Sequence, residues 1–299
     1  MPAYARSEII DELSVGMYHC INRCVRRSFL CGEDAVSGRN FDHRKQWLEN
    51  RIGVLAKIFA IEIAFFAVMD NHIHVVVINR PDHAQSWDDN EIAERWWSLY
   101  PRKGSTQLPE ELKQLWLADP AFIAERRSRL SCISWFMRCL CEPLAKIANR
   151  EDKVTGRFWE GRFKSIKVLD PEAAIETGIY VDLNPIKAGT ADSIESSAHT
   201  SIAQRVEAVM HNAPPSLAKP VKEILKIFAV EAPFLLEDER DYIAIVRLRA
   251  RELQESQQKA AEHRAYFAAF PTAIGSAASL RLEAIRRKRK WLKGISRAR

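Results

Sequence analysis

The stretch "AVMDNHIHVVVINRP", residues 67–81, decides the fold, because it reads as the end of one strand, a tight turn and a second strand. The apolar run "IEIAFFAVM" leads to a turn at Asp70–Asn71, and "HIHVVVI" follows the turn. Two apolar runs joined by two turn-forming residues are typical of a hairpin. We therefore expect two antiparallel strands here, with His72 and His74 at the start of the second.

Working outward from this hairpin, the chain alternates strands with helices. The patterns predict a strand over 16–25, a helix over 41–60, the hairpin, a helix over 130–149, a strand within 155–170 and a further helix after Asp170. This order is typical of a split βαβ, ferredoxin-like sheet, in which right-handed crossovers place the first and third strands at the centre. The predicted fold class is α+β, with a ferredoxin-like sheet, a further helix after it and a mainly helical C-terminal extension.

Two regions fall outside this plan. Residues 81–130 contain prolines and a polar stretch, and we interpret them as an insertion. Residues 191–299 are mainly helical and contain a basic run at 286–290. The predicted organisation is therefore a core over 14–190, interrupted at 81–130, and an extension over 191–299 with a basic tail.

Composition narrows the class of partner. The chain has 299 residues and a formal net charge of +6. A positive balance favours an anionic partner, of which nucleic acid is the commonest. The first residues form no apolar signal core and no stretch approaches the length of a membrane span, so we expect a cytoplasmic protein, nucleoid-associated when bound to DNA, with no membrane partner and with its six cysteines reduced.

The histidines of the hairpin are the first candidates for a site. Alternation along a strand points His72 and His74 to one face and Ile73 to the other. Two imidazoles so placed can share a divalent cation. Taken alone, however, two histidines at this spacing indicate an ordinary half-exposed strand face rather than a metal site. A divalent cation also needs three or more protein ligands. We interpret His19, on the first strand, as an ordinary core or surface residue.

The helix after Asp170 can supply the missing ligand. Asp170 is a favoured N-cap residue and Pro171 suits the first helical position. Glu176, Tyr180 and Asn184 are spaced by four residues and share one helical face. Tyr180 offers a hydroxyl and Asn184 a carbonyl oxygen. The adjacent apolar stripe, which would dock the helix on the sheet, consists of Ile175, Ile179 and Leu183. For Tyr180 alone, a packing role is the alternative.

A segment that mixes cations with aromatic residues leads into this helix. "GRFWEGRFKSIK", residues 156–167, combines groups that contact phosphates with rings that stack on unpaired bases. The alternative is a strand whose aromatic residues are core and whose charges are solvated. The predicted DNA-binding residues are Arg157, Trp159, Arg162, Lys164 and Lys167.

Four motifs, in this order, resemble a known family. They are "YHCINR" (18–23), "AVMDNHIHVVV" (67–77), "GRFWEGRFKS" (156–165) and "YVDLNPIKAG" (180–189). Together they resemble the single-tyrosine transposases of the His-hydrophobic-His (HUH) nuclease superfamily, and among these the REP-associated tyrosine transposases. The resemblance covers about residues 14–190.

The resemblance implies a DNA transposase or endonuclease that cleaves and rejoins single-stranded hairpin DNA through a 5′-phosphotyrosine. Tyr180 is then the nucleophile, and His72, His74 and Asn184 bind a divalent cation, Mg²⁺ or Mn²⁺. The implied partner is single-stranded or hairpin DNA, and such enzymes act as monomers or homodimers. A non-cleaving, hairpin-binding regulator with the same fold is the first alternative. A metal phosphodiesterase with a water nucleophile and a purely structural protein are the others.

Overall fold

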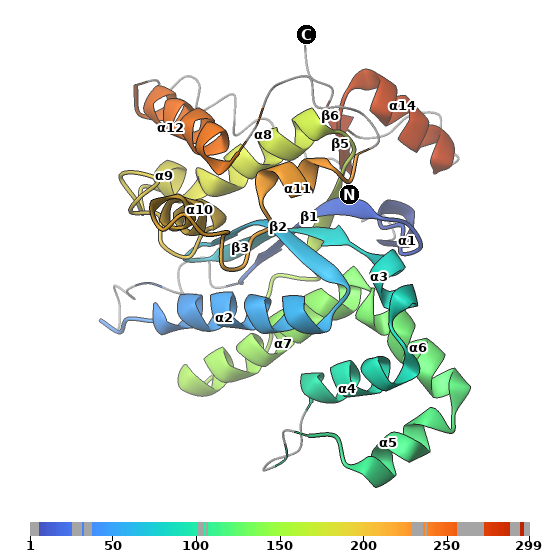
Figure 1. Ribbon diagram of the computed structural model, residues 1–299. Helices are drawn as coiled ribbons and strands as arrows, with labels where there is room; N and C mark the ends of the chain where they lie inside the picture. Colours follow the sequence, from blue (N-terminus) through green and yellow to red (C-terminus); the bar gives the residue numbers. More distant parts are fainter. Residues whose placement is uncertain are drawn as a thin grey trace.

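The computed structural model describes residues 6–25, 32, 38–100, 105, 107–228, 236, 238–255, 272–287 and 294–295. A central sheet separates two layers of helices (Figure 1). Its strand order is β2-β3-β1-β4-β5-β6. The strands are β1 (Gly16–Arg23), β2 (Ile61–Val68), β3 (His72–Asn79), β4 (Lys164–Val168), β5 (Ala273–Ile274) and β6 (Gly294–Ile295).

The first four strands confirm the predicted fold class. They pair antiparallel with β1 and β3 in the middle, which is the ferredoxin-like order. The hairpin between β2 and β3 turns at Asp70–Asn71, where the backbone N–H of Met69 donates to the carbonyl of His72. The short strands β5 and β6, which the sequence does not predict, extend the sheet in parallel.

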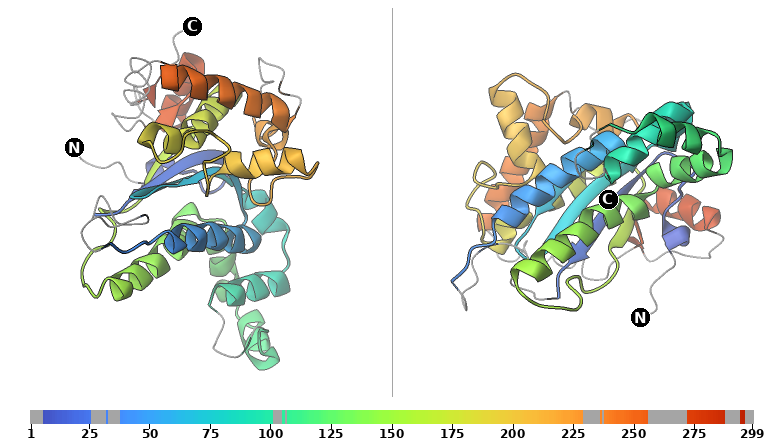
Figure 2. Two further views of the ribbon diagram at one scale, coloured as in Figure 1. Left: turned by 90° about the vertical axis from the view of Figure 1, so that its left-hand side faces the viewer. Right: turned by 90° about the horizontal axis from the view of Figure 1, so that it is seen from below.

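One face of the sheet is covered by α2 (His43–Ile58) and α7 (Ile133–Glu151), which lie side by side (Figure 2). Ile73, Val75 and Val77 of β3 are fully buried in the core on this side. Because strand side chains alternate, the neighbouring His72, His74 and Val76 must point to the opposite face. The histidines therefore face away from α2 and α7, as predicted.

The insertion forms four helices that project on the α2 side of the molecule (Figure 1). Asp88 and Asp119 cap two of these helices through their carboxylates. Ile92 and Ala93 are buried in the core shared with α2 and α7, so the insertion packs on this layer of helices. The helices are α3 (Pro81–Ser86), α4 (Asp89–Leu99), α5 (Glu110–Leu117) and α6 (Pro120–Leu130).

The histidine-bearing face is covered by α8 (Pro171–Asp182) and by helices that follow it. Asp170 caps α8 as predicted, because its Oδ1 accepts from the N–H of Ala173 at 2.8 Å. The predicted docking stripe is buried in this core: Ile175, Ile179 and Leu183. The later helices are α9 (Asn184–Ala188), α10 (Ser201–Met210), α11 (Val221–Leu225), α12 (Glu239–Glu255) and α14 (Ala277–Arg286), and a short α1 (Arg6–Ile9) precedes the sheet.

Gly178 allows α8 to approach the sheet closely. A Cβ at this position would lie 2.6 Å from ring carbons of Phe65 and 2.7 Å from the hydroxyl of Tyr242. A register shift between Ile63 and Phe65 places both Ala64 and Phe65 on this face, where the Phe65 ring meets the helix. Any larger residue than glycine at 178 would push α8 outward.

Asp182, at the end of α8, ties this helix to residues far along the chain. Its fully buried carboxylate accepts from Ser201 Oγ at 2.5 Å, from the Ile202 N–H at 3.0 Å and from the Tyr242 hydroxyl at 2.7 Å. Helices from both sides of residue 190 thus share one core, and the boundary at 190 stays a prediction. None of the helices described here is long and apolar enough to cross a bilayer.

The predicted basic tail is only partly within the described residues. Arg286 ends α14, and Arg287 follows it. Residues 288–290 of the basic run lie outside the described residues.

Candidate active site

Strands β1 and β3 and helix α8 bring four rings together, which we call the ring cluster: His19, His72, His74 and Tyr180. The ring centroids of His72 and His74 are 4.8 Å apart. Tyr180 lies 5.7 Å from His74 and 6.1 Å from His19, and His19 lies 5.0 Å from His74, all between centroids. The paired imidazoles and the phenol therefore meet within a single chain.

The contact between His19 and His74 orients the second ring. His19 Nε2 lies 2.8 Å from His74 Nδ1, and both side chains are buried. His74 Nε2 is also buried, and no hydrogen-bond partner for it exists among the described residues. When Nδ1 of His74 donates to His19, Nε2 carries the lone pair, which is the arrangement of a metal-binding imidazole.

His72 is prepared in the same way. Its Nδ1 lies 2.5 Å from Asn71 Oδ1, an oxygen that can only accept, so Nδ1 carries the proton and Nε2 the lone pair. Two oriented imidazole nitrogens and the amide oxygen of Asn184 would form a mixed donor set that fits Mn²⁺ better than the oxygen-preferring Mg²⁺. Within the described ranges, no three His, Cys, Asp or Glu side chains are grouped to hold a metal ion. Among these described residues a third ligand would thus be of another type, and Asn184 stays the predicted one.

The protonation states suit metal binding. Burial lowers the pKa of His19 to about 3, with a further contribution from the charge of His72. Burial also lowers the pKa of His72 to about 4, assisted by Arg23, and the pKa of His74 to well below its ordinary value. All three imidazoles are consequently neutral at pH 7, which is the form that binds a metal ion.

Tyr180 and Asn184 stand on either side of a break between two helices. α8 ends at Asp182 and α9 begins at Asn184, yet Asn184 Nδ2 still donates to the carbonyl of Tyr180 at 2.8 Å. This bond fixes the amide one turn after the tyrosine, as the spacing predicts. Burial raises the pKa of the half-buried Tyr180, while the Asn184 amide and the charge of Arg23 act in the opposite direction.

Two cations at the site were not singled out from the sequence. Lys187 Nζ lies 4.3 Å from the centre of the Tyr180 ring. Arg23 is opposite His72 in the register of β1 and β3, and its charge reaches both His72 and Tyr180. Both residues fall inside the quoted motifs, but no spacing rule marks them. They place positive charge where a phosphate would approach the phenol.

Glu176, the third residue of the predicted helical face, takes no part in the ring cluster. Its carboxylate lies 3.7 Å from the guanidinium of Arg249 on α12. The side chain therefore points toward α12.

The predicted DNA-binding segment runs past the end of β1 that holds the site. The N–H of Glu160 donates to the carbonyl of Arg23 at 2.9 Å. Arg157, Arg162 and Lys164 are exposed. Their contacts with DNA stay a prediction.

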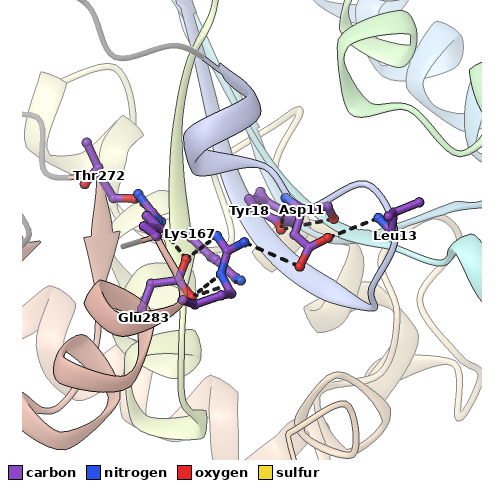
Figure 3. A network of polar contacts seen from close by, with 8 residues as sticks. Asp11, Leu13, Tyr18, Lys167, Thr272 and Glu283 are labelled. Carbon is purple, nitrogen blue, oxygen red and sulfur yellow. Dashed lines mark hydrogen bonds and ion pairs between the residues drawn. The ribbon is translucent and has the colours of Figure 1, made fainter. Parts of the chain in front are cut away.

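The remaining residues of that segment are engaged within the chain. Lys167 is half-buried, and its Nζ lies 3.2 Å from Glu283 Oε2 of α14 (Figure 3). Trp159 donates from Nε1 to the carbonyl of Cys141 at 2.9 Å. Phe158 and Phe163 are core residues, as the alternative interpretation has it.

The sequence matches no protein-family model and no curated protein. Among solved structures, the chain is similar to a REP-associated tyrosine transposase bound to a REP hairpin, with 14% sequence identity and a TM-score of 0.42. The similarity covers 79% of this chain and 100% of the other. That protein is of the family that the sequence motifs resemble.

Proposed function

We propose that this protein is a metal-dependent DNA strand transferase, which cuts and rejoins single-stranded hairpin DNA with Tyr180 as its nucleophile. The observation that carries the proposal is the ring cluster: a half-buried phenol beside two oriented, neutral imidazoles in the same chain. The hairpin form of the substrate is supported by the resemblance of the four motifs alone.

The reaction is a phosphoryl transfer. Tyr180 Oη attacks phosphorus, an Oη–P bond forms and the P–O3′ bond breaks. The phenol gives up its proton and the leaving 3′ oxygen gains one, so that a 5′-phosphotyrosine and a 3′-hydroxyl result. Because the energy of the phosphodiester is kept in the covalent link, a second 3′-hydroxyl can reverse the step and join new ends without ATP.

The chain's own residues bind and orient the reacting groups. Arg23 and Lys187 attract the phosphate, and the charge of Arg23 opposes the rise in the pKa of Tyr180 that burial causes. His72, His74 and Asn184 would hold the divalent cation, with His19 orienting His74. When bound, such a cation polarises the phosphate and favours the phenolate.

The test is to incubate the protein with an end-labelled, single-stranded hairpin oligonucleotide and Mn²⁺, followed by a denaturing gel. We expect a protein band that carries covalently attached DNA, and we expect it to disappear on chelation or with Tyr180→Phe. Tyr100→Phe is the matched control, because Tyr100 is an exposed tyrosine on α4's C-terminal side, outside the ring cluster.

Two results would contradict the proposal. Cleavage that persists in Tyr180→Phe without a covalent adduct would indicate a water nucleophile. Tight binding of the hairpin with neither cleavage nor adduct, under any divalent cation, would indicate a non-cleaving DNA-binding protein.

A further inference from the structure

A groove lies on the α7 side of the sheet, on the face opposite the ring cluster. It has a volume of about 560 Å³ and runs between α7 and the segment 159–163. We call it the tryptophan groove. Its lining includes Trp135, Arg138 and Glu142 from α7, Trp159 and Arg162 from the segment, and Asn22 from β1.

The two indoles of the groove are held in place by their neighbours. The Trp159 N–H bond to Cys141 fixes one indole, and Phe158 meets it edge-on at 5.0 Å between centroids. The Trp135 ring packs against the guanidiniums of Arg129 at 4.4 Å and of Arg138 at 5.0 Å, each measured to the ring centroid. Both indoles are half-buried and line the groove. Rigid aromatic faces of this kind bind planar groups with little loss of side-chain freedom.

The charge of the groove favours an anionic occupant. Arg138 is 59% exposed and pairs with Glu142 at 3.0 Å. Arg162 is exposed, and no ion pair involving it appears in the described part of the chain. The lining contains two guanidiniums and one carboxylate, so its net charge is positive. Aromatic faces beside guanidiniums match a chain of phosphates that carries planar bases.

The end of β1 connects this groove to the ring cluster. Asn22 lines the groove and donates from Nδ2 to Cys141 Sγ at 3.4 Å. The next residue, Arg23, points to the other face, where its charge acts on His72 and Tyr180. A DNA strand with one phosphate at Tyr180 therefore has to pass only the end of β1 to enter the groove.

We infer that the tryptophan groove binds unpaired nucleotides of single-stranded DNA that flank the phosphate attacked by Tyr180. Bases stack on Trp135 and Trp159, and phosphates contact Arg138 and Arg162. The inference rests on the proposed function, because it takes single-stranded DNA as the substrate. It also gives α7 a part in substrate binding.

The experiment measures equilibrium binding of the full chain, without metal, to two labelled DNA hairpins, one with single-stranded flanks and one without. Trp135→Leu should weaken binding of the flanked hairpin about 5- to 100-fold, the range expected for loss of one stacked base, and leave the bare hairpin unchanged. Arg138→Ala should lower the slope of log affinity against log salt by about 1.

Matched controls separate the groove from general effects. Trp116→Leu removes a half-buried indole of α5, and Arg150→Ala removes an exposed arginine of α7; neither residue lines the groove. Neither change should alter binding of either hairpin. Photo-crosslinking of a flank that carries 5-iododeoxyuridine should attach DNA to Trp135 or Trp159.

The outcomes distinguish the two proposals. If the unaltered chain forms the Tyr180 adduct but Trp135→Leu and Arg138→Ala bind the flanked hairpin unchanged, the groove inference is wrong and the proposed function stands. If the unaltered chain binds neither hairpin, both fail. If an RNA of the same sequence binds more tightly and loses that advantage in Trp135→Leu, the groove has a different occupant. Should Trp135→Leu fail to fold, the exposed Arg138 still provides the test.

Discussion

His19 Nε2 lies 2.8 Å from His74 Nδ1, so a residue of β1 determines which nitrogen of the β3 histidine is available for binding. The two residues are 55 positions apart in the sequence. Across the sheet, His19 is paired with Val76, and His74 is the next residue of β3 on the same face. His19 is thus a positioning residue for the predicted metal ligand.

Replacing His19 by Phe should weaken Mn²⁺ binding by about 10- to 100-fold, because His74 loses the partner that orients it. Isothermal titration calorimetry of the purified chain with Mn²⁺ measures this change in affinity. His19→Gln, which keeps a polar partner, should recover part of the affinity. Equal Mn²⁺ affinity in both variants and in the unaltered chain would show that His19 is only a core residue.

Gly178→Ala should destabilise the protein by about 2 kcal/mol, although alanine is the better helix former by about 1 kcal/mol. The reason is the approach of 2.6 Å between the added methyl and the Phe65 ring. Gly53 is the matched control, because a Cβ there meets only Leu217 Cδ1 at 3.9 Å. Gly53→Ala should stabilise by up to about 1 kcal/mol. Urea unfolding measures both, and a stabilised Gly178→Ala would show that α8 can move away.

Asp182→Ala should lower the free energy of unfolding by about 3 kcal/mol, because it leaves the Tyr242 hydroxyl and the Ser201 hydroxyl without their buried acceptor. The same change should reduce adduct formation, since Asp182 fixes the end of α8 two residues after Tyr180. The measurements are urea unfolding and the denaturing-gel assay. Asp192→Ala, an exposed aspartate, should leave both unchanged.

Glu283 links stability to pH. Burial alone would raise the pKa of this carboxyl, but hydrogen bonds from Arg286 and Arg287 and the charge of Lys167 outweigh burial and lower the pKa to about 2. A lowered folded-state pKa contributes stability above the ordinary value near 4.5, and this contribution is lost as the pH falls from about 4.5 to about 2. The loss should be about 3 kcal/mol.

The check is the pH dependence of urea unfolding between pH 2 and pH 7. Glu283→Gln should be less stable at neutral pH and should lose this part of the acid dependence. Glu207→Gln, which changes an exposed glutamate of α10, should keep the acid dependence of the unaltered chain. If the free energy of unfolding of Glu283→Gln and of the unaltered chain varied with pH in parallel, Glu283 would not be the source of this acid dependence.

The sequence predicted those parts of the site that have a local pattern. The apolar hairpin located β2 and β3, and the N-cap Asp170 and the stripe from Ile175 to Leu183 located α8, because strand alternation and helix caps act over a few residues. The convergence of His72, His74 and Tyr180 followed from the order of these elements, while their chemical roles stay predictions.

Other features depend on contacts between distant residues, which no local pattern contains. His19 reaches His74 only through the register of β1 and β3, so a single histidine on a mixed strand gave no indication of it. Lys167 was predicted as a DNA contact, yet it is paired with Glu283, 116 residues later. The strands β5 and β6 are two residues each, too short for a period to be visible.

Tyr180 lies on a helix that packs on the sheet of the same chain, and this arrangement predicts how mixtures of two variants behave. The proposed nucleophile and the two histidines proposed to bind the metal ion lie together in one chain, so the proposed reaction needs none of these groups from a neighbouring molecule. Combining Tyr180→Phe with His74→Ala should therefore yield no complementation, and initial rates should rise in simple proportion to the amount of unaltered protein added.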